Sequence, residues 1–60
     1  QRILEHLKMK ASLSGSPAID IRHREIANAL GTSREVITRV LRKLEKENKI
    51  TQEEGKIRVL

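Results

Sequence analysis

The chain has 60 residues, 13 of them Lys or Arg and 8 Asp or Glu, and its formal net charge is +5. This length allows one small domain with a single core and leaves little room for a catalytic pocket. The absence of Cys excludes a disulfide framework and Cys-based zinc sites, and the absence of Phe, Tyr and Trp disfavours proteins that stack unpaired bases on aromatic side chains.

The basic excess favours an anionic partner, because clustered Lys and Arg side chains gain free energy by releasing counterions from phosphates. No apolar run approaches the roughly 20 residues of a membrane span, and no signal-peptide core is visible. We therefore expect a soluble, cytoplasmic domain without a membrane partner. Because the sequence begins at Gln1 and not at Met, we expect residues 1–60 to be a single domain from the C-terminal part of a longer protein.

Four apolar residues near the start of the chain share one helical face: Ile3, Leu4, Leu7 and Ala11. Met9 lies near the edge of this face, where filling the core is the expected role of a methionine. Residues 12–17, SLSGSP, collect Ser, Gly and Pro, which end helices and favour turns. The pattern predicts a first helix up to about Ala11, followed by a loop.

Residues 18–21 alternate apolar and polar side chains and predict a short strand with Ile19 and Ile21 facing inward. Residues 24–31, REIANALG, then place three apolar side chains on one helical face: Ile26, Ala27 and Leu30. Gly31 stands where a helix commonly ends in a left-handed conformation. We expect a second helix of about two turns that ends at this glycine.

Residues 33–47 predict a third helix. Ser33 is a suitable N-cap, and Glu35 in the first turn suits the positive end of the helix dipole. One arc of this helix carries the apolar side chains expected to face the core: Val36, Ile37, Val40, Leu41 and Leu44.

The C-terminal residues 50–60 predict a β-hairpin, because a polar turn ending at Gly55 precedes the alternation of Ile57 and Val59 with basic residues. A short helix, the turn of residues 31–33 and a second helix with an apolar back make a helix-turn-helix, to which the hairpin adds a wing. The expected fold is mainly α with a small β-sheet: a winged helix-turn-helix of three helices and a C-terminal hairpin.

The opposite face of the third helix is polar and contains three Arg within nine residues. Arg can pair bidentately with guanine O6 and N7, and Glu can accept from the cytosine amino group, in a major groove wide enough for a helix. Arg34, Glu35 and Arg39 are well placed for such contacts. The residues alone also allow a solvated face on which Glu35 pairs with Arg39 across one turn. The helix-turn-helix context favours base contact.

The segment REIANALGTSREVITRVLRKLEKENKI and the hairpin that follows it resemble the DNA-binding domain of the catabolite activator protein and FNR family of bacterial transcription regulators. The resemblance covers about residues 19–60, and its most specific element is S-R-E-x-x-x-R followed by L-x-x-L-E. It implies sequence-specific binding of double-stranded DNA by the output domain of a transcription regulator, with residues 33–47 in the major groove. It also implies a full-length homodimer with an N-terminal effector-binding domain.

The resemblance further implies roles for single residues. Arg34, Glu35 and Arg39 match the base-reading residues of the family, and Arg34, typical of the catabolite-activator branch, implies a TGTGA-like half-site. Thr38 stands where the FNR branch carries Ser, and it is a further candidate for base contact. Ser33 matches the residue that caps the recognition helix and contacts a phosphate.

Further basic residues are candidate phosphate contacts: Arg22, Arg24, Arg42, Lys43 and Lys56. Two features depart from the family pattern. Arg22 stands where many members carry Thr or Ser as the cap of the first motif helix, so this cap is missing or is shifted to Asp20. In the hairpin, the negative charges of Glu53 and Glu54 repel phosphate, and we expect the wing to add little affinity.

The fold alone leaves two other functions open, a winged helix that binds protein and one that binds RNA. An enzyme is not expected, because no nucleophile has a base and an orienting acid at a recognisable spacing and no Gly-rich phosphate loop occurs. No cofactor is expected within these residues. His6 and His23 are interpreted as solvated imidazoles and not as metal ligands, although a protonated His23 could contact phosphate.

Overall fold

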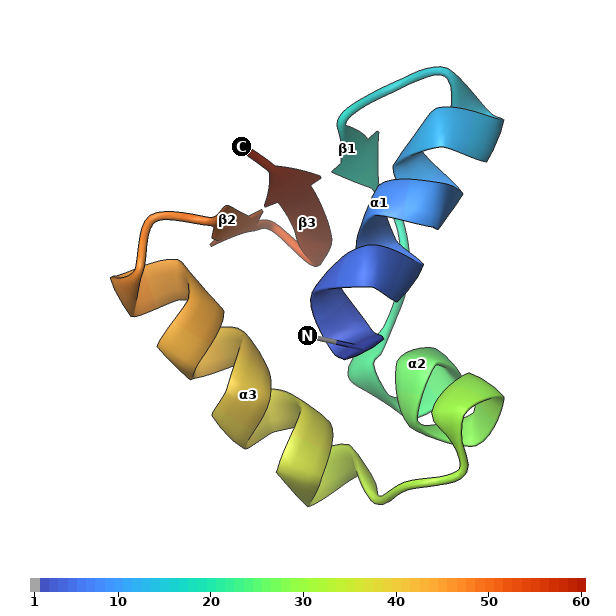
Figure 1. Cartoon of the computed structure of the whole chain (residues 1–60), viewed down its shortest axis with the longest axis vertical. Helices are drawn as coiled ribbons and strands as arrows, with labels where there is room; N and C mark the ends of the chain where they lie inside the picture. Colours follow the sequence, from blue (N-terminus) through green and yellow to red (C-terminus); the bar gives the residue numbers. More distant parts are fainter. Residues whose placement is uncertain (1) are drawn as a thin grey trace.

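The computed structural model describes residues 2–60. Three helices and a three-stranded antiparallel sheet enclose one core, with the sheet and the turn between α2 and α3 at opposite ends (Figure 1). The predicted winged helix-turn-helix is confirmed. The elements, in chain order, are α1 (Arg2–Ser14), β1 (Ala18–Ile19), α2 (His23–Leu30), α3 (Arg34–Lys46), β2 (Ile50–Glu53) and β3 (Lys56–Val59).

Helix α1 is one turn longer than the sequence pattern predicted. The expected end at Ala11 is wrong, because the Ser14 hydroxyl donates to the Ala11 carbonyl at 3.0 Å and the helix continues through Ser14. It stops at Gly15, which has φ of +72°. The Ser16 amide then donates to the Ala11 carbonyl, as at a typical helix end with a left-handed residue.

The turn between α2 and α3 has the geometry that its sequence predicts. Gly31 adopts φ of +66°, and its amide donates to the Ala27 carbonyl. Ala27 is buried where the two helices meet. Ser33 then caps α3, its hydroxyl accepting from the Val36 amide at 3.2 Å. Capping at both sides of a three-residue turn fixes the angle at which α3 leaves α2.

The start of α2 differs slightly from expectation. The helix begins at His23, one residue before the predicted start, with Arg22 in the N-cap position. Arg22 makes no side-chain cap hydrogen bond, as predicted. Within residues 2–60 the Asp20 side chain makes no hydrogen bond either, so the cap is missing and not shifted. The first amides of α2 therefore remain open.

The core combines all three helices with the inner face of the sheet. Its buried members are Ile3, Leu4, Leu7, Ile19, Ile21, Ile26, Ala27, Ile37, Leu41, Leu44, Ile50 and Ile57. Two expected core residues are exposed instead. Met9 is 49% exposed because it lies about 200° around α1 from Leu7. Val36 is 41% exposed because it stands at the edge of the apolar arc, where neither α1 nor α2 covers it fully.

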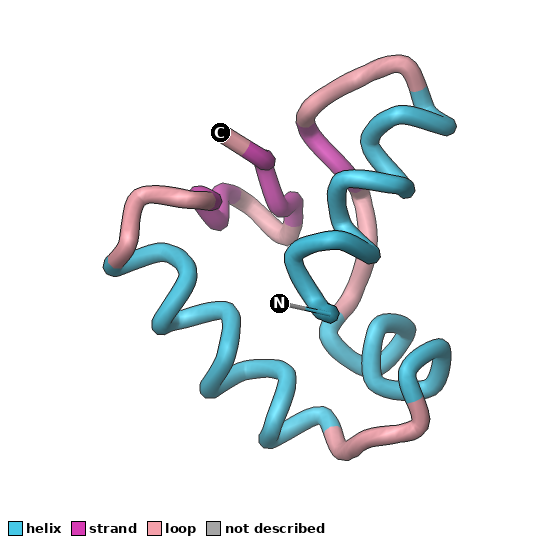
Figure 2. The backbone as a smooth tube through the Cα atoms, in the orientation of Figure 1, coloured by secondary structure: helices cyan, strands magenta, loops and turns pink. Residues whose placement is uncertain are grey.

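The sheet joins the C-terminal hairpin to the segment before α2. Its order is β1-β3-β2, and Ile19 pairs with Ile57. The predicted strand over residues 18–21 is shorter than expected, since only its first two residues pair, although Ile21 is still buried. Figure 2 shows the strands close to one another at the end of the molecule where the chain finishes. The wing is thus anchored to the body along β1.

Candidate nucleic-acid interface

The outward face of α3 carries the residues that were predicted to meet DNA. Its exposed side chains are Arg34, Glu35, Arg39, Arg42 and Lys43. Ile37, Leu41 and Leu44 on the opposite side hold the helix against the core. A helix fixed in this way presents its polar side chains on a rigid support.

Arg34, Glu35 and Arg39 on this face form no hydrogen bonds or ion pairs with one another. Within residues 2–60, Arg34, Glu35 and Arg39 have no hydrogen-bond or ion-pair partner, and the salt bridge found joins Lys49 to Glu47 at 3.6 Å. The alternative in which Glu35 pairs with Arg39 along the helix therefore does not describe this structure. The donors and acceptors of the three side chains are available to a ligand.

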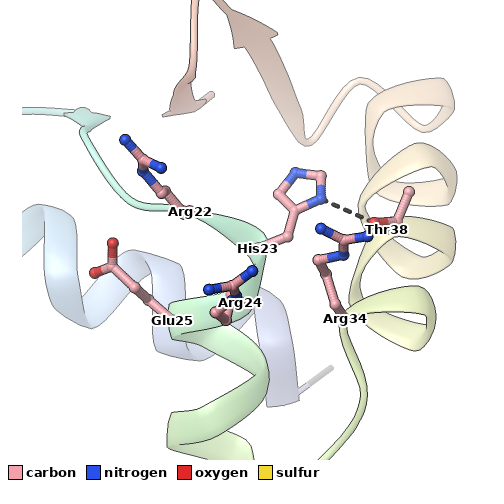
Figure 3. Close-up of a pocket in the computed structure, with 6 residues that line it drawn as sticks. All are labelled: Arg22, His23, Arg24, Glu25, Arg34 and Thr38. Carbon is pink, nitrogen blue, oxygen red and sulfur yellow. Dashed lines mark hydrogen bonds between the residues drawn. The ribbon is translucent and has the colours of Figure 1, made fainter.

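A concavity of about 590 Å³ lies beside this face, between the first turns of α2 and α3. We call it the arginine hollow; its lining residues are Arg22, His23, Arg24, Glu25, Arg34 and Thr38. Figure 3 shows the α2 side chains on one side and those of α3 on the other. The lining carries three guanidinium groups and one carboxylate, and the uncapped start of α2 adds the positive end of its dipole. The arginine hollow suits an anion such as phosphate.

The fold brings together only some of the predicted site residues. Arg22, Arg24, Arg34 and Thr38 meet at the arginine hollow. The rest of the α3 candidates follow the exposed face of that helix, and Lys56 lies separately at the start of β3.

A histidine missed as a site residue by the sequence interpretation joins three elements. His23 is half-buried, and its Nδ1 lies 2.9 Å from Thr38 Oγ1 while its Nε2 lies 2.9 Å from Gln52 Oε1. Gln52 Nε2 in turn donates to Glu45 Oε1 at 3.5 Å. The interpretation of His23 as a solvated imidazole is therefore wrong. Its partners are 15 and 29 residues away, a separation at which local sequence patterns carry no signal.

The wing contains a second concavity, of about 520 Å³, which we call the wing hollow; it is lined by Ala18, Glu53, Glu54, Lys56 and Arg58. Opposite charges lie across the hairpin, since Glu53 and Lys56 are directly paired in the register. Two carboxylates balance two basic groups here. The wing hollow therefore lacks the positive excess of the arginine hollow.

Within residues 2–60, no group of three or more His, Cys, Asp or Glu side chains is arranged to hold a metal ion. Over the same residues, no helix has the length and apolar character needed to cross a membrane.

Comparison with known proteins gives a consistent result. A family model described as a Crp-like helix-turn-helix domain matches residues 1–60. A structure described as a transcriptional regulator of the Crp/Fnr family from Eubacterium rectale is 41% identical over 98% of this chain, with a TM-score of 0.95. The catabolite activator protein of Thermus thermophilus is 37% identical over 98% of this chain, with a TM-score of 0.84. This chain spans 27% and 28% of those two, and no curated protein matches it.

Proposed function

Because the chain belongs to the family of Crp-like helix-turn-helix domains, we propose that it binds double-stranded DNA sequence-specifically as the output domain of a transcription regulator. The observation that carries the proposal is the polar face of α3, on which Arg34, Glu35 and Arg39 are exposed and, among the described residues, unpaired, beside the arginine hollow. In a helix-turn-helix the second helix enters the major groove with its N-terminal residues toward the bases. Helix α3 carries these three residues within its first two turns.

Each of the three side chains has a chemical role in this proposal. The planar forks of Arg34 and Arg39 donate to guanine O6 and N7, and the Glu35 carboxylate accepts from a cytosine amino group. Thr38 is a further base contact in the same stretch of α3. The family resemblance implies a TGTGA-like half-site, whose G·C pairs offer partners for these donors and acceptors.

The α2 side of the arginine hollow positions the helix on the DNA backbone. Arg22 and Arg24 approach one phosphate from the start of α2, and the open amides of that helix add neutral donors. Ser33 keeps its hydroxyl proton free for a second phosphate while its oxygen caps α3. Arg42 and Lys43 follow farther along the exposed face of α3, and Lys56 provides one contact from the wing. Contacts of this kind fix register without reading sequence.

The regulator of which this chain is the output domain acts, in this proposal, as a cytoplasmic homodimer. Two copies then read two half-sites about 34 Å apart, one helical turn of B-DNA. Duplexes with two half-sites at varied spacing should show tightest binding by the full-length regulator at that separation or a multiple of it.

The decisive experiment is a selection of binding sites from random duplex DNA at low salt, followed by titration at several salt concentrations. We expect a consensus with G·C pairs and an affinity that falls steeply with salt, by about 0.9 log units per log unit of salt for each phosphate contacted. Arg39→Ala should relax the consensus at one base pair. A consensus without G·C pairs, or one that Arg39→Ala leaves unchanged, would contradict direct readout.

A protein-binding winged helix is the second candidate, and one observation favours it. Val36, Leu30 and Val40 line a small apolar concavity of about 230 Å³ with Arg2, Ile3 and Thr32. An exposed apolar surface of this kind suits a protein neighbour. If this surface carries the function, Val36→Asp should abolish it, whereas Arg39→Ala should not affect it.

A further inference from the structure

The hydrogen bonds of His23 determine which way the Thr38 hydroxyl points its proton. Gln52 donates through Nε2 to the Glu45 carboxylate, so its Oε1 is the atom that faces the imidazole. A carbonyl oxygen can only accept, and His23 Nε2 must therefore carry a proton. In the neutral ring, Nδ1 is then the unprotonated nitrogen.

The consequence reaches the recognition helix. An unprotonated Nδ1 can only accept, so at 2.9 Å the Thr38 hydroxyl must be the donor. Its proton is committed to the ring, and the oxygen presents only lone pairs to any other partner. Thr38 is half-buried and is one of the residues that line the arginine hollow (Figure 3).

We propose that His23 is a positioning residue that sets base preference at Thr38 by holding the Thr38 hydroxyl as a hydrogen-bond acceptor toward DNA. The inference rests on the proposed function, because it assumes that α3 lies in the major groove. Bases with an amino group in that groove are adenine, through N6, and cytosine, through N4. Guanine O6 and N7 and thymine O4 offer only acceptors, which an acceptor cannot bind. Thr38 therefore selects adenine or cytosine.

The same hydrogen bonds make the preference reversible. When the ring is doubly protonated, Nδ1 becomes a donor, Thr38 Oγ1 accepts from it, and the hydroxyl proton turns outward. Thr38 then favours guanine or thymine. The charged groups around the ring are Arg22, Arg24, Glu25 and Arg34 at the arginine hollow and Glu45 beyond Gln52.

The test uses site selection from random duplex DNA at pH 8, with the 60-residue chain and four variants. Thr38→Val removes the hydroxyl and keeps the branched shape, and it should relax one position of the consensus. His23→Ala should relax the same position, by roughly 2- to 12-fold, the ratio for one neutral hydrogen bond. His23→Asn should restore part of the preference, since its amide oxygen can occupy the place of Nδ1. In the Thr38→Val background, His23→Ala should have no further effect at that position.

A repeat at about pH 5.5, where an imidazole can become doubly protonated, provides a readout that a purely structural role would not move. The wild-type preference should shift from adenine or cytosine toward guanine or thymine, and Thr38→Val should show no shift. Thermal melts of each variant identify any that fail to fold. If the His23 variants fail to fold, the effect of Thr38→Val on the consensus alone tests whether the Thr38 hydroxyl contacts a base.

The outcomes separate this inference from the function on which it rests. A wild-type consensus that His23→Ala leaves unchanged at every position, or that Thr38→Val leaves unchanged, overturns the role of His23 and keeps DNA binding. A wild-type selection without any duplex preference overturns the proposed function itself.

Discussion

The arginine hollow and the wing hollow have nearly the same size but opposite suitability for an anion. Their volumes are about 590 and 520 Å³. The first sets three arginines against one glutamate, whereas the second sets Lys56 and Arg58 against Glu53 and Glu54. Shape alone therefore does not distinguish a binding surface on this small domain. The balance of charge does, because attraction to a phosphate depends on the sum of nearby charges.

The largest effect is expected from a change in the core that supports α3. Leu41 is fully buried on the inner side of α3, and Leu41→Ala should lower the free energy of unfolding by about 2 to 5 kcal/mol. A domain of this size has little stability to spare, so most of the protein should be unfolded at 37 °C. Circular dichroism melts measure the change. Leu13→Ala is the matched control, because Leu13 is 78% exposed and its loss should leave the melting temperature unchanged.

The next largest effect is expected at Arg34, which lines the arginine hollow but is proposed to read a base. Arg34→Ala should cost about 1 to 3 kcal/mol on the preferred duplex and relax the preference at one base pair, because its fork reads a base. Fluorescence anisotropy on the preferred duplex and on single-base variants measures both quantities. Equal loss of affinity on every duplex would show that Arg34 contacts only the backbone.

A smaller effect distinguishes the two hollows directly. Arg24→Ala should weaken binding to all duplexes alike. It should also reduce the slope of log affinity against log salt by about 0.9, the contribution of one phosphate contact. Arg58→Ala, the matched change in the wing hollow, should leave that slope nearly unchanged. Salt titrations of both variants give the comparison. If the wing variant lost as much slope as Arg24→Ala, the charge argument would be wrong.

The smallest effect is expected when one negative charge is removed from the wing hollow, which makes its charge more like that of the arginine hollow. Glu54 adopts φ of +45° before Gly55 at φ of +78°, in a two-residue hairpin turn that favours Asn-Gly. Glu54→Asn should therefore stabilise the domain by less than about 1 kcal/mol and strengthen DNA binding slightly, since it also removes a negative charge. Melts and anisotropy check the two parts. Glu53→Gln removes a charge without the turn effect and should strengthen binding slightly without the gain in stability.

Most of the fold was predictable because its signals are local. Gly31 predicts the end of one helix and Ser33 the start of the next, and both caps form as expected. The S-R-E-x-x-x-R motif predicted the family that the whole-chain match confirms. Errors arose where distant residues decide the outcome. Val36 lies at the edge of the apolar arc of α3, and only the positions of α1 and α2 determine whether it is covered. Met9 was misjudged for a local reason, because it lies about 200° around α1 from Leu7.

The candidate interface was predictable only in part. The exposure of Arg39 follows from the helical period, because it lies about 160° around α3 from both Ile37 and Leu41. Arg22 and Arg24 lie near Arg34 because the short helix α2 packs against α3 along its whole length of eight residues, so that its start is close to the first turns of α3. The partners of His23 were not predictable, because Gln52 reaches the ring only once β2 is in place. The base-reading and phosphate roles remain predictions.

The position of β3 sets the order in which the domain can assemble during synthesis. This strand follows β1 and β2 in the sequence yet is the middle strand of the sheet, and the Val59 amide donates to the Pro17 carbonyl at 2.9 Å. A ribosome delivers the chain from its N-terminus, so β1 and the helix-turn-helix emerge while their central strand is missing. In the nascent chain Ile19 lacks its strand partner until Ile57 leaves the exit tunnel.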